Sequence, residues 1–464
     1  MNEQEPAVAC KGCLELQAQV ALLRARIDDL EERLGLDSTN SSKPPSTDPP
    51  AKARPPRSRN QEKRRRKADR RGGHQRQLLA PERVTSFVAC KPATCACCGE
   101  PLVGDDPSPE RHQTVEMPPV VPLVTEFQVH TLCCGGCGAS TRGTLPHQAK
   151  ETFGPHLVAL VALMIGTYHL SRRQTQGFLG AVMNIELSLG SIHNQTLEVA
   201  KAVEQPVAEV AEAIKRAPVV HCDESGWKRQ RGYRVLWVAV CGLMAHFKIQ
   251  TERSKAACQT MVGDVVDNRI IVSDRYSAYK WIWDANRQVC WAHLDRDFLL
   301  MSQAKEELAK ETGQGLLGCA DEVFEAAAAQ SAGELDWAVF VEGMSKVRQR
   351  VRAIASGGMA SAHKKTAAVC RFMVEHEEAV WTFARVGGVE ATNNRAERAI
   401  RPAVLWRRSS QGTRTDEGEK FVGAMLTVTE TLKLQGRQVL SWLTEAVVAQ
   451  RQGSAPPSLL PLPT

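Results

Sequence analysis

Residues 217–227 read APVVHCDESGW, and the apolar first half of this stretch predicts a buried strand. Two adjacent acids, Asp223 and Glu224, end the apolar run. A carboxylate at the exit of a buried strand costs free energy unless it is paired or binds a cation. Because successive side chains of a strand point to opposite faces, only one of the two acids can easily join a shared site. The stretch therefore predicts an α/β core that carries one functional carboxylate here.

Two further acids have a comparable setting. Asp274 ends a second apolar strand, RIIVSD, and Glu397 lies in the polar stretch NNRAERAIRP, which predicts the start of a helix. Either Asn393 or Asn394 would cap that helix. A single aspartate at a strand end is more often a turn or cap residue, so the interpretation depends on the three acids together.

Two aspartates from strand ends and one glutamate from a helix suit divalent-cation chemistry on DNA. Phosphoryl transfer commonly uses two divalent ions about 3.5–4 Å apart. Mg2+ (or Mn2+) prefers a few carboxylates, with water and phosphate oxygens as its other ligands. Asp223, Asp274 and Glu397 are therefore the candidate catalytic residues and the candidate ligands of two Mg2+ (or Mn2+) ions. Glu224 is expected to face the other way.

The pattern from residue 217 onward is that of a mixed α/β domain whose sheet has an antiparallel start. The expected strands cover 217–224, 233–242, 244–250, 269–274 and 287–293, and the expected short helices cover 254–266 and 276–283. Residues 295–385 then become strongly helical. The tail after Gln450 is rich in proline, and we expect it to be disordered.

The chain has 464 residues, which suggests two to four domains, and its net charge of +7 is unevenly spread. Residues 51–76 hold twelve Lys or Arg and two acids, a local charge of +10, so the other residues sum to −3. A charge run is often only a solvated segment, but beside a DNA enzyme it predicts contacts to the phosphate backbone. The candidate contacts are Arg64, Arg65, Arg66, Lys67, Arg70 and Arg71.

The N-terminal segment has an apolar repeat. The spacing is 4-3-4-3-4, which is typical of a coiled-coil seam that pairs two chains. An amphipathic helix that packs on its own protein is the alternative. The residues of the seam are Leu16, Val20, Leu23, Ile27, Leu30 and Leu34.

No apolar run approaches the roughly 18 residues that a membrane span needs. The N-terminus also lacks the apolar core of a secretion signal. We therefore expect a cytoplasmic, nucleoid-associated protein without a membrane partner.

Seven of the fifteen cysteines lie between residues 90 and 137. Two pieces of this cluster share the form C-x-x-C-G, CACCG at 95–99 and CGGCG at 134–138. Such paired knuckles suit one structural Zn2+ in a zinc ribbon, and the segment between them alternates like strands. The predicted ligands are Cys95, Cys98, Cys134 and Cys137, and the alternative ligands are Cys90, Cys97 and Cys133.

Residues 153–215 are expected to be helical. LSRRQTQGFLGAVM, the break NIELS and LGSIHNQTLEVAKAV together resemble a helix-turn-helix whose second helix could enter a major groove. A small helical packing domain is the alternative.

Basic residues surround Glu397 in the sequence. Guanidinium groups suit phosphate oxygens, so the group is a candidate DNA contact, although each arginine taken singly fits a surface salt bridge. His293 is equally well interpreted as a phosphate contact or as a core histidine. Cys290 and His293 could together bind a metal, but two ligands alone do not form a metal site. The arginines are Arg395, Arg398, Arg401, Arg407 and Arg408.

Several segments in this order resemble the transposases of the insertion sequence 66 family over nearly the whole chain. They are SSKPPSTDPP, CACCGE, CCGGCG, PVVHCDESGW, IIVSDRYSAY, CWAHLDRDF and GVEATNNRAERAIRPAVLWRRSSQGT. Small departures from the family pattern are Cys222, Ser225 and Asp295.

The resemblance implies an RNase H-like core with an Asp-Asp-Glu triad, which falls here on Asp223, Asp274 and Glu397. It implies a transposase that binds the ends of its insertion sequence and performs Mg2+-dependent strand cleavage and strand transfer into target DNA. The implied partners are double-stranded DNA, a second or further copies in a synaptic complex, and small accessory proteins of the same element.

The predicted fold is therefore multidomain. Its parts are a coiled coil at 1–37, a Ser/Pro and basic linker at 38–80, a zinc ribbon at 81–150, a helix-turn-helix-like region at 151–216, the catalytic domain at 217–432 with a helical insertion at about 295–388, and a C-terminal helix and tail at 433–464. The alternative functions are a catalytically inactive DNA-binding regulator with the same fold and a structure-specific nuclease.

Overall fold

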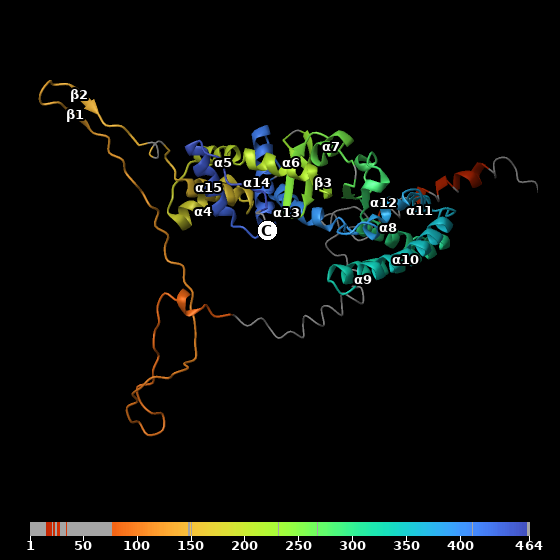
Figure 1. The fold of residues 1–464 in the computed structure, drawn as a ribbon, viewed down its shortest axis with the longest axis horizontal. Coiled ribbons are helices and arrows are strands. Elements are labelled where there is room, and N and C mark those ends of the chain that lie inside the picture. The colour runs from red at the N-terminus through yellow and green to blue at the C-terminus, as the bar shows by residue number, and fades with distance from the viewer. Residues whose placement is uncertain are drawn as a thin grey trace, which may run out of the picture. The chain divides into compact units, whose positions relative to one another are not determined.

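The computed structural model describes residues 15–20, 22–23, 26–27, 34, 77–146, 149, 151–230, 232–266, 268–410 and 412–461 (Figure 1). The chain divides into two compact units, Pro49–Val121 and a larger unit of Met1–Asp48 with Pro122–Thr464. The predicted basic arm at 51–76, with its six candidate DNA contacts, lies outside the described residues, as does the Ser/Pro-rich segment at 38–50.

The described residues of the N-terminal segment are helical. The seam side chains are 40–85% exposed, so the described part of this chain does not cover them. Pairing of this seam with a second chain stays a prediction. The described seam residues are Leu16, Val20, Leu23, Ile27 and Leu34.

The region of the two knuckles has little regular structure. A 3-10 turn, η2, spans Pro81–Arg83, and a short antiparallel pair, β1 Thr131–Cys133 with β2 Ser140–Arg142, flanks the second knuckle. The strands expected between the knuckles do not form in residues 102–130. Pro118, Pro119 and Pro122 in that segment lack the N–H group that a strand ladder needs.

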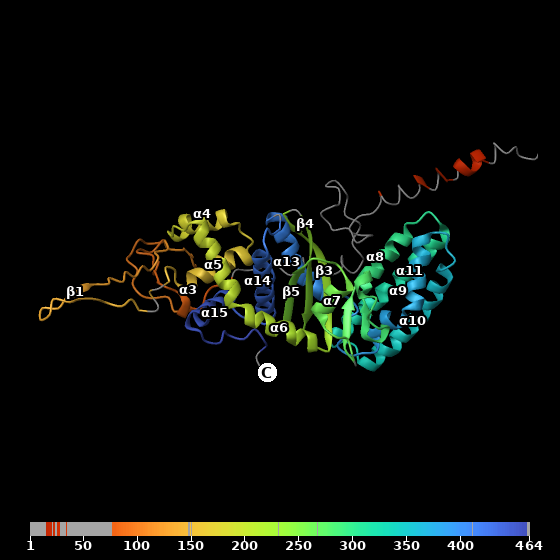
Figure 2. The ribbon, with the colours of Figure 1, turned by 90° about the horizontal axis from the view of Figure 1, so that it is seen from above.

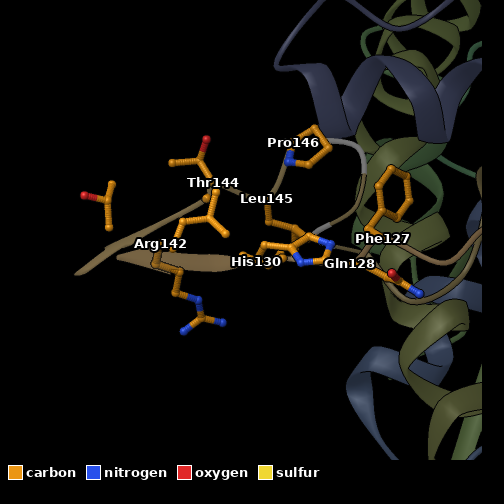
Figure 3. A pocket seen from close by; sticks show the side chains of 11 residues that line it. Phe127, Gln128, His130, Arg142, Thr144, Leu145 and Pro146 are labelled. Carbon is orange, nitrogen blue, oxygen red and sulfur yellow. The ribbon is translucent and has the colours of Figure 1, made fainter. Parts of the chain in front are cut away.

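A pocket lies beside the β1–β2 hairpin (Figure 3). Its lining comes from residues 127–130, Leu132 and residues 141–146, and it includes none of the candidate catalytic acids or zinc ligands.

Four helices precede the sheet: α3 Pro155–Gly166, α4 Arg172–Met183, α5 Leu189–Ala202 and α6 Glu204–Arg216. Ser171 and Gln174 form a capping box at the start of α4, and Ser188 caps α5. Asn184 ends α4 in the left-handed conformation with φ 53°, which turns the chain toward α5. Two consecutive helices thus lie where the sequence predicts a helix-turn-helix-like region.

The sheet has five strands in the order β5-β4-β3-β6-β7. β3, β4 and β5 pair antiparallel, whereas β6 pairs in parallel with both β3 and β7. The antiparallel start was predicted. The strands and the helix between them are β3 Val219–Arg229, β4 Gly232–Cys241, β5 Met244–Gln250, α7 Lys255–Val262, β6 Ile270–Ser273 and β7 Arg287–Val289.

Three expected boundaries in this region were wrong. β3 continues to Arg229 because β4 pairs with it along that whole length, so Asp223 lies within the strand and does not end it. The helix expected at 276–283 is only a 3-10 turn, η4 Ser277–Tyr279, followed by η5 Asp284–Asn286. β7 stops at Val289, and a helix begins at Trp291.

Helices after the insertion cover the sheet. α13 Asn394–Ser410 packs on β3 and β4, and α14 Asp416–Leu434 runs along β5. Thr427 and Thr431 of α14 bond the backbone of Phe247 and Ala245 in β5. Because β5 is an edge strand, these hydroxyls satisfy main-chain groups that would otherwise have no ladder partner.

The predicted insertion is helical and has its own core. Its elements are α8 Trp291–Ser302, α9 Glu307–Ser331, α10 Trp337–Gly358, α11 Lys364–Glu375, α12 Glu377–Val380 and η6 Thr382–Ala384. Figure 2 shows the sheet lying between this insertion and α14. Ile271 of β6 belongs to the main core, whereas Ile270 and Val272 belong to the core of the insertion. The alternation of one strand thus joins the two cores.

The C-terminal tail is ordered as far as it is described, so the expectation of disorder after Gln450 was wrong for residues 451–461. The helix α15 Val439–Gln452 precedes it. Leu459 is fully buried in the main core, and its carbonyl accepts a hydrogen bond from Gln435 at 2.8 Å. Trp442 Nε1 and Arg437 donate to Ser458 O. One buried leucine and main-chain bonds anchor a segment whose composition suggests a free tail.

Among the described residues, no helix is long and apolar enough to cross a membrane.

His246 on β5 predicts how the stability of the folded chain depends on pH. Burial and the nearby charges of Lys248 and Lys215 lower the pKa of His246 to about 4. The folded state keeps the ring neutral, whereas the unfolded chain binds a proton below about pH 6.5. The neutral His246 ring therefore contributes fully to the free energy of unfolding above about pH 6.5, and this contribution is lost as the pH falls toward 4.

We expect wild type to lose about 2–3 kcal/mol more stability than His246→Leu between pH 7 and pH 4. Urea denaturation at both pH values measures the difference. His112→Leu, at an exposed ring, is the control and should follow wild type. Equal losses in wild type and His246→Leu would contradict the prediction.

Candidate catalytic site

The parallel ladder between β3 and β6 brings two of the candidate acids together. His221 pairs with Val272, and two residues further on this register sets Asp223 beside Asp274. Neighbouring strands lie about 4.8 Å apart, so the two carboxylates start from adjacent backbone positions at one level of the sheet. The sequence predicted both acids, but the register that joins them is a property of the folded sheet.

The main chain around Asp274 is held firmly. Its carboxylate accepts the N–H of Tyr276 at 2.9 Å, which forms a turn directly after β6. Its carbonyl accepts a bond of 2.7 Å from the buried guanidinium of Arg287. Arg287 therefore positions this acid from β7, a role that the sequence did not indicate.

Glu397 lies in the first turn of α13, and Asn393 fastens that turn to the sheet. Asn393 Nδ2 donates to Cys222 O at 2.8 Å, and the backbone N–H of Asn393 donates to Cys290 Sγ at 3.1 Å. Asn393 is fully buried, and its carbonyl accepts the N–H of Glu397 at 3.1 Å. The predicted capping role of its side chain is thus replaced by a bond to β3, next to Asp223.

The three acids influence one another electrically. Burial, then the charges of Glu224 and Asp274, and finally that of Glu397 raise the pKa of Asp223 well above its usual range. Like charges in a poorly solvated place disfavour ionisation, and a cation would relieve that repulsion. Glu397 Oε1 is also buried without a hydrogen-bond partner among the described residues. Both features fit a site that holds divalent cations.

Glu224 faces the other way, as strand alternation predicted. Its Oε1 accepts bonds from Arg253 Nε at 2.8 Å and Nη2 at 2.5 Å, and its Oε2 accepts the hydroxyl proton of Tyr279. The Glu224 side chain is fully buried, and these two partners compensate its charge. No local pattern in the sequence indicates either partner, because both are distant in the chain.

The other face of β3 meets α13. Trp227 packs edge-on against Trp406 of α13 with ring centroids 6.4 Å apart. Asp223 and Trp227 share a face because they are four residues apart on one strand. Asp223 therefore lies on the side of the sheet that α13 and Glu397 occupy.

His293 and Cys290 lie next to Glu397. His293 Nδ1 is 3.5 Å from Glu397 Oε1, and Arg296 Nη2 is 3.8 Å from the same oxygen. Burial and the charge of Arg296 lower the pKa of His293, which favours its neutral form. The structure thus places His293 at the candidate site, half-buried, and adds Arg296 to the predicted residues.

The five arginines around α13 have different surroundings. Arg395 pairs with Glu390 at 2.5 Å, and Arg407 donates to Ser225 Oγ at 3.2 Å and to Gly226 O. These two already have protein partners. Arg398, Arg401 and Arg408 are exposed.

Each predicted zinc knuckle has the expected local form. Gly99 and Gly138 have φ values of 77° and 73°, and their N–H groups bond to Cys95 O and Cys134 O. Backbone N–H groups of Cys98 and Cys97 lower the pKa of the Cys95 thiol. Gly136 and Cys137 do the same for the Cys134 thiol. Such amide–sulfur bonds suit thiolate ligands of zinc.

The two knuckles belong to different compact units, Pro49–Val121 and the unit that contains Pro122–Thr464. A shared four-cysteine site therefore stays a prediction.

Comparison with known proteins gives the family. Residues 150–420, more than half of the chain, match the family described as Transposase IS66 family, and residues 2–79 match a family of unknown function (DUF6444). The chain therefore belongs to the IS66 family of transposases.

A curated relative, the uncharacterized protein y4qI of Sinorhizobium fredii (strain NBRC 101917 / NGR234), is 31% identical over 96 residues. The matched part covers 21% of this chain and 18% of the relative.

Asn393 allows a direct test of how α13 is fastened. Asn393→Ala removes a donor from a buried carbonyl, and we expect a loss of about 1–3 kcal/mol in the free energy of unfolding. The exposed neighbour Asn394 is the matched control, and Asn394→Ala should change the stability much less. Chemical denaturation of both variants gives the values. Equal effects at the two positions would show that the bond to Cys222 O does not hold the helix.

Proposed function

We propose that this chain is a DNA transposase that binds the ends of its insertion sequence and catalyses Mg2+-dependent strand cleavage and strand transfer into target DNA. The observation that carries the proposal is the register of β3 and β6, which sets Asp223 beside Asp274 on the sheet that α13 and Glu397 cover. Membership of the IS66 family supports the same reaction class.

The sheet supports an RNase H-like core. Three antiparallel strands followed by two parallel ones, in the order β5-β4-β3-β6-β7, have the topology expected of that fold. The helical insertion between β7 and α13 then corresponds to an insertion within the core. A shared fold does not determine the reaction that a protein catalyses, so the proposed reaction is inferred from the three acids.

Asp223, Asp274 and Glu397 would hold two Mg2+ (or Mn2+) ions, and their arrangement fits that role. Bound ions of this kind activate an attacking oxygen and stabilise a leaving oxygen of phosphate. The protein's own part is positioning: Arg287 fixes the main chain of Asp274, and Asn393 fixes the turn that carries Glu397.

DNA would be bound by several parts of the chain. Among the described residues, the exposed Arg398, Arg401 and Arg408 on α13 suit phosphate contacts. α5, one face of which packs against α3, α14 and α15, would be the helix that enters a major groove. The basic segment at 51–76 would add salt-sensitive contacts without sequence information. The four knuckle cysteines would hold one structural Zn2+ in a module that helps to read the ends.

Assembly would use the N-terminal seam. Its exposed apolar side chains suit pairing with a second copy, as a synaptic complex of two transposon ends needs. Small accessory proteins of the same element are further candidate partners.

An inactive DNA-binding regulator of the same fold is the alternative function. It would most simply have lost one of the acids, and this chain retains all three. A structure-specific nuclease would cut DNA but would not join the freed strand to a target.

The test is cleavage and joining of DNA that carries the element's native ends, with purified full-length protein. We expect Glu397→Gln to lower Mg2+-dependent cleavage by about 100-fold or more, because loss of a metal ligand costs several kcal/mol of transition-state stabilisation. Glu417→Gln, at an exposed position of α14, is the matched control and should retain activity.

Gel analysis distinguishes nicked ends from joined products. Cleavage without joining would favour the nuclease. DNA binding without cleavage in wild type would favour the regulator. Equal cleavage by wild type and Glu397→Gln would remove Glu397 from the site.

A further inference from the structure

Cys290, His293 and Glu397 form a cluster that the sequence did not reveal. Their sulfur, ring nitrogen and carboxylate oxygen all lie within 4.8 Å of one another. Cys290 and His293 come from the start of α8, and Glu397 comes from the first turn of α13. The cysteine and histidine alone would be only two ligands, and the folded chain adds the third.

The contact between His293 and Glu397 has the spacing of two metal ligands. His293 Nδ1 and Glu397 Oε1 are 3.5 Å apart, yet both atoms are buried and lack a hydrogen-bond partner among the described residues. Two ligands that each lie about 2.0–2.1 Å from a tetrahedral zinc ion are about 3.3 Å apart. A cation between these atoms would satisfy both of them at close to the observed separation.

Burial raises the pKa of the Cys290 thiol to about 12, so its thiolate needs a bound cation. Two features would stabilise that thiolate once a cation is bound. Cys290 is the N-cap residue of α8, where the positive end of a twelve-residue helix favours negative charge. Its Sγ also accepts the backbone N–H of Asn393 at 3.1 Å. An amide–sulfur bond of this kind is a common outer-shell support for a metal-bound thiolate.

We propose that Cys290, His293 and Glu397 form a binding site for a thiophilic divalent cation of the zinc class, with solvent as the fourth ligand. A thiolate and an imidazole select Zn2+ over Mg2+, which takes oxygen ligands. The proposed site shares no ligand with the zinc site predicted at the two cysteine knuckles.

A regulatory consequence rests on the proposed function. Glu397 belongs to both sites, so a zinc-class ion held by Cys290 and His293 engages the carboxylate that the Mg2+ site needs. The thiophilic ion should therefore inhibit Mg2+-dependent cleavage, and release of the ion should restore it.

The experiment first measures binding, which does not depend on activity. Metal-free full-length protein is titrated with Co2+, a spectroscopic substitute for Zn2+ that absorbs strongly when a thiolate is bound. Wild type is compared with Cys290→Ala and with Cys370→Ala, which removes another buried thiol, in the core of the insertion. Because the knuckles are unchanged in all three proteins, the difference between them reports the new site.

We expect Cys290→Ala to bind about one Co2+ equivalent fewer per chain than wild type and to lose part of the thiolate absorption, whereas Cys370→Ala matches wild type. His293→Gln should lower the affinity in the same way, which provides a second test if Cys290→Ala folds poorly. Equal stoichiometry and spectra in wild type, Cys290→Ala and His293→Gln would overturn the proposal.

The second measurement adds Zn2+ to the Mg2+-dependent cleavage reaction. Wild type should be inhibited at a Zn2+ concentration at least tenfold below the one that inhibits Cys290→Ala. A protein that binds Co2+ through Cys290 but never cleaves DNA supports the metal site and contradicts the proposed function. Cleavage with unaltered Co2+ binding in the variants supports the function and overturns the site.

Discussion

The parallel pairing of β3 with β6 is the constraint on which the candidate site depends. Continued by two residues past the pair of His221 and Val272, its register sets Asp223 within β3 beside Asp274, which directly follows β6. Burial raises the pKa of Asp223 well above its usual range, and the charges of Glu224, Asp274 and Glu397 raise it further. Glu397 has a nearby cationic side chain, Arg296 at 3.8 Å, and a bound cation would relieve the remaining repulsion among the three acids. Glu224, one residue away on the opposite face, has its counter-ion in Arg253 and needs none.

The two hydrophobic cores meet at the same strands. β6 contributes Ile271 to the main core and Ile270 and Val272 to the core of the insertion. The position of Asp274 directly after β6 therefore depends on both cores. The helical insertion is thus part of what holds the site in place, and Asn393 extends this link by bonding both Cys222 O and Cys290 Sγ.

Sequence patterns predicted most elements of the α/β body and its helical insertion, because strands and helices there have clear apolar periods. The predictions were wrong where a contact with a distant segment sets the length of a strand or the order of a tail. β3 runs past Asp223 because β4 pairs with it as far as Arg229, and no local signal in ESGWKR gives that length. Leu459 anchors a proline-rich tail because it is buried in the main core, and the tail's own composition does not indicate this burial. The expected strands between the knuckles were disfavoured by prolines that the sequence did contain.

The sequence by itself determined which residues are candidates for chemistry: three acids, two cysteine knuckles, a basic segment and a cysteine–histidine pair. It also determined their faces, because alternation along one strand separates Asp223 from Glu224. Only the tertiary structure decided which of these groups meet. The register of β3 and β6, the bonds of Asn393 and the contact of Glu397 on α13 with His293 on α8 all join segments far apart in the chain. Such contacts depend on the free energy of packing whole elements together, which no local stretch of sequence encodes.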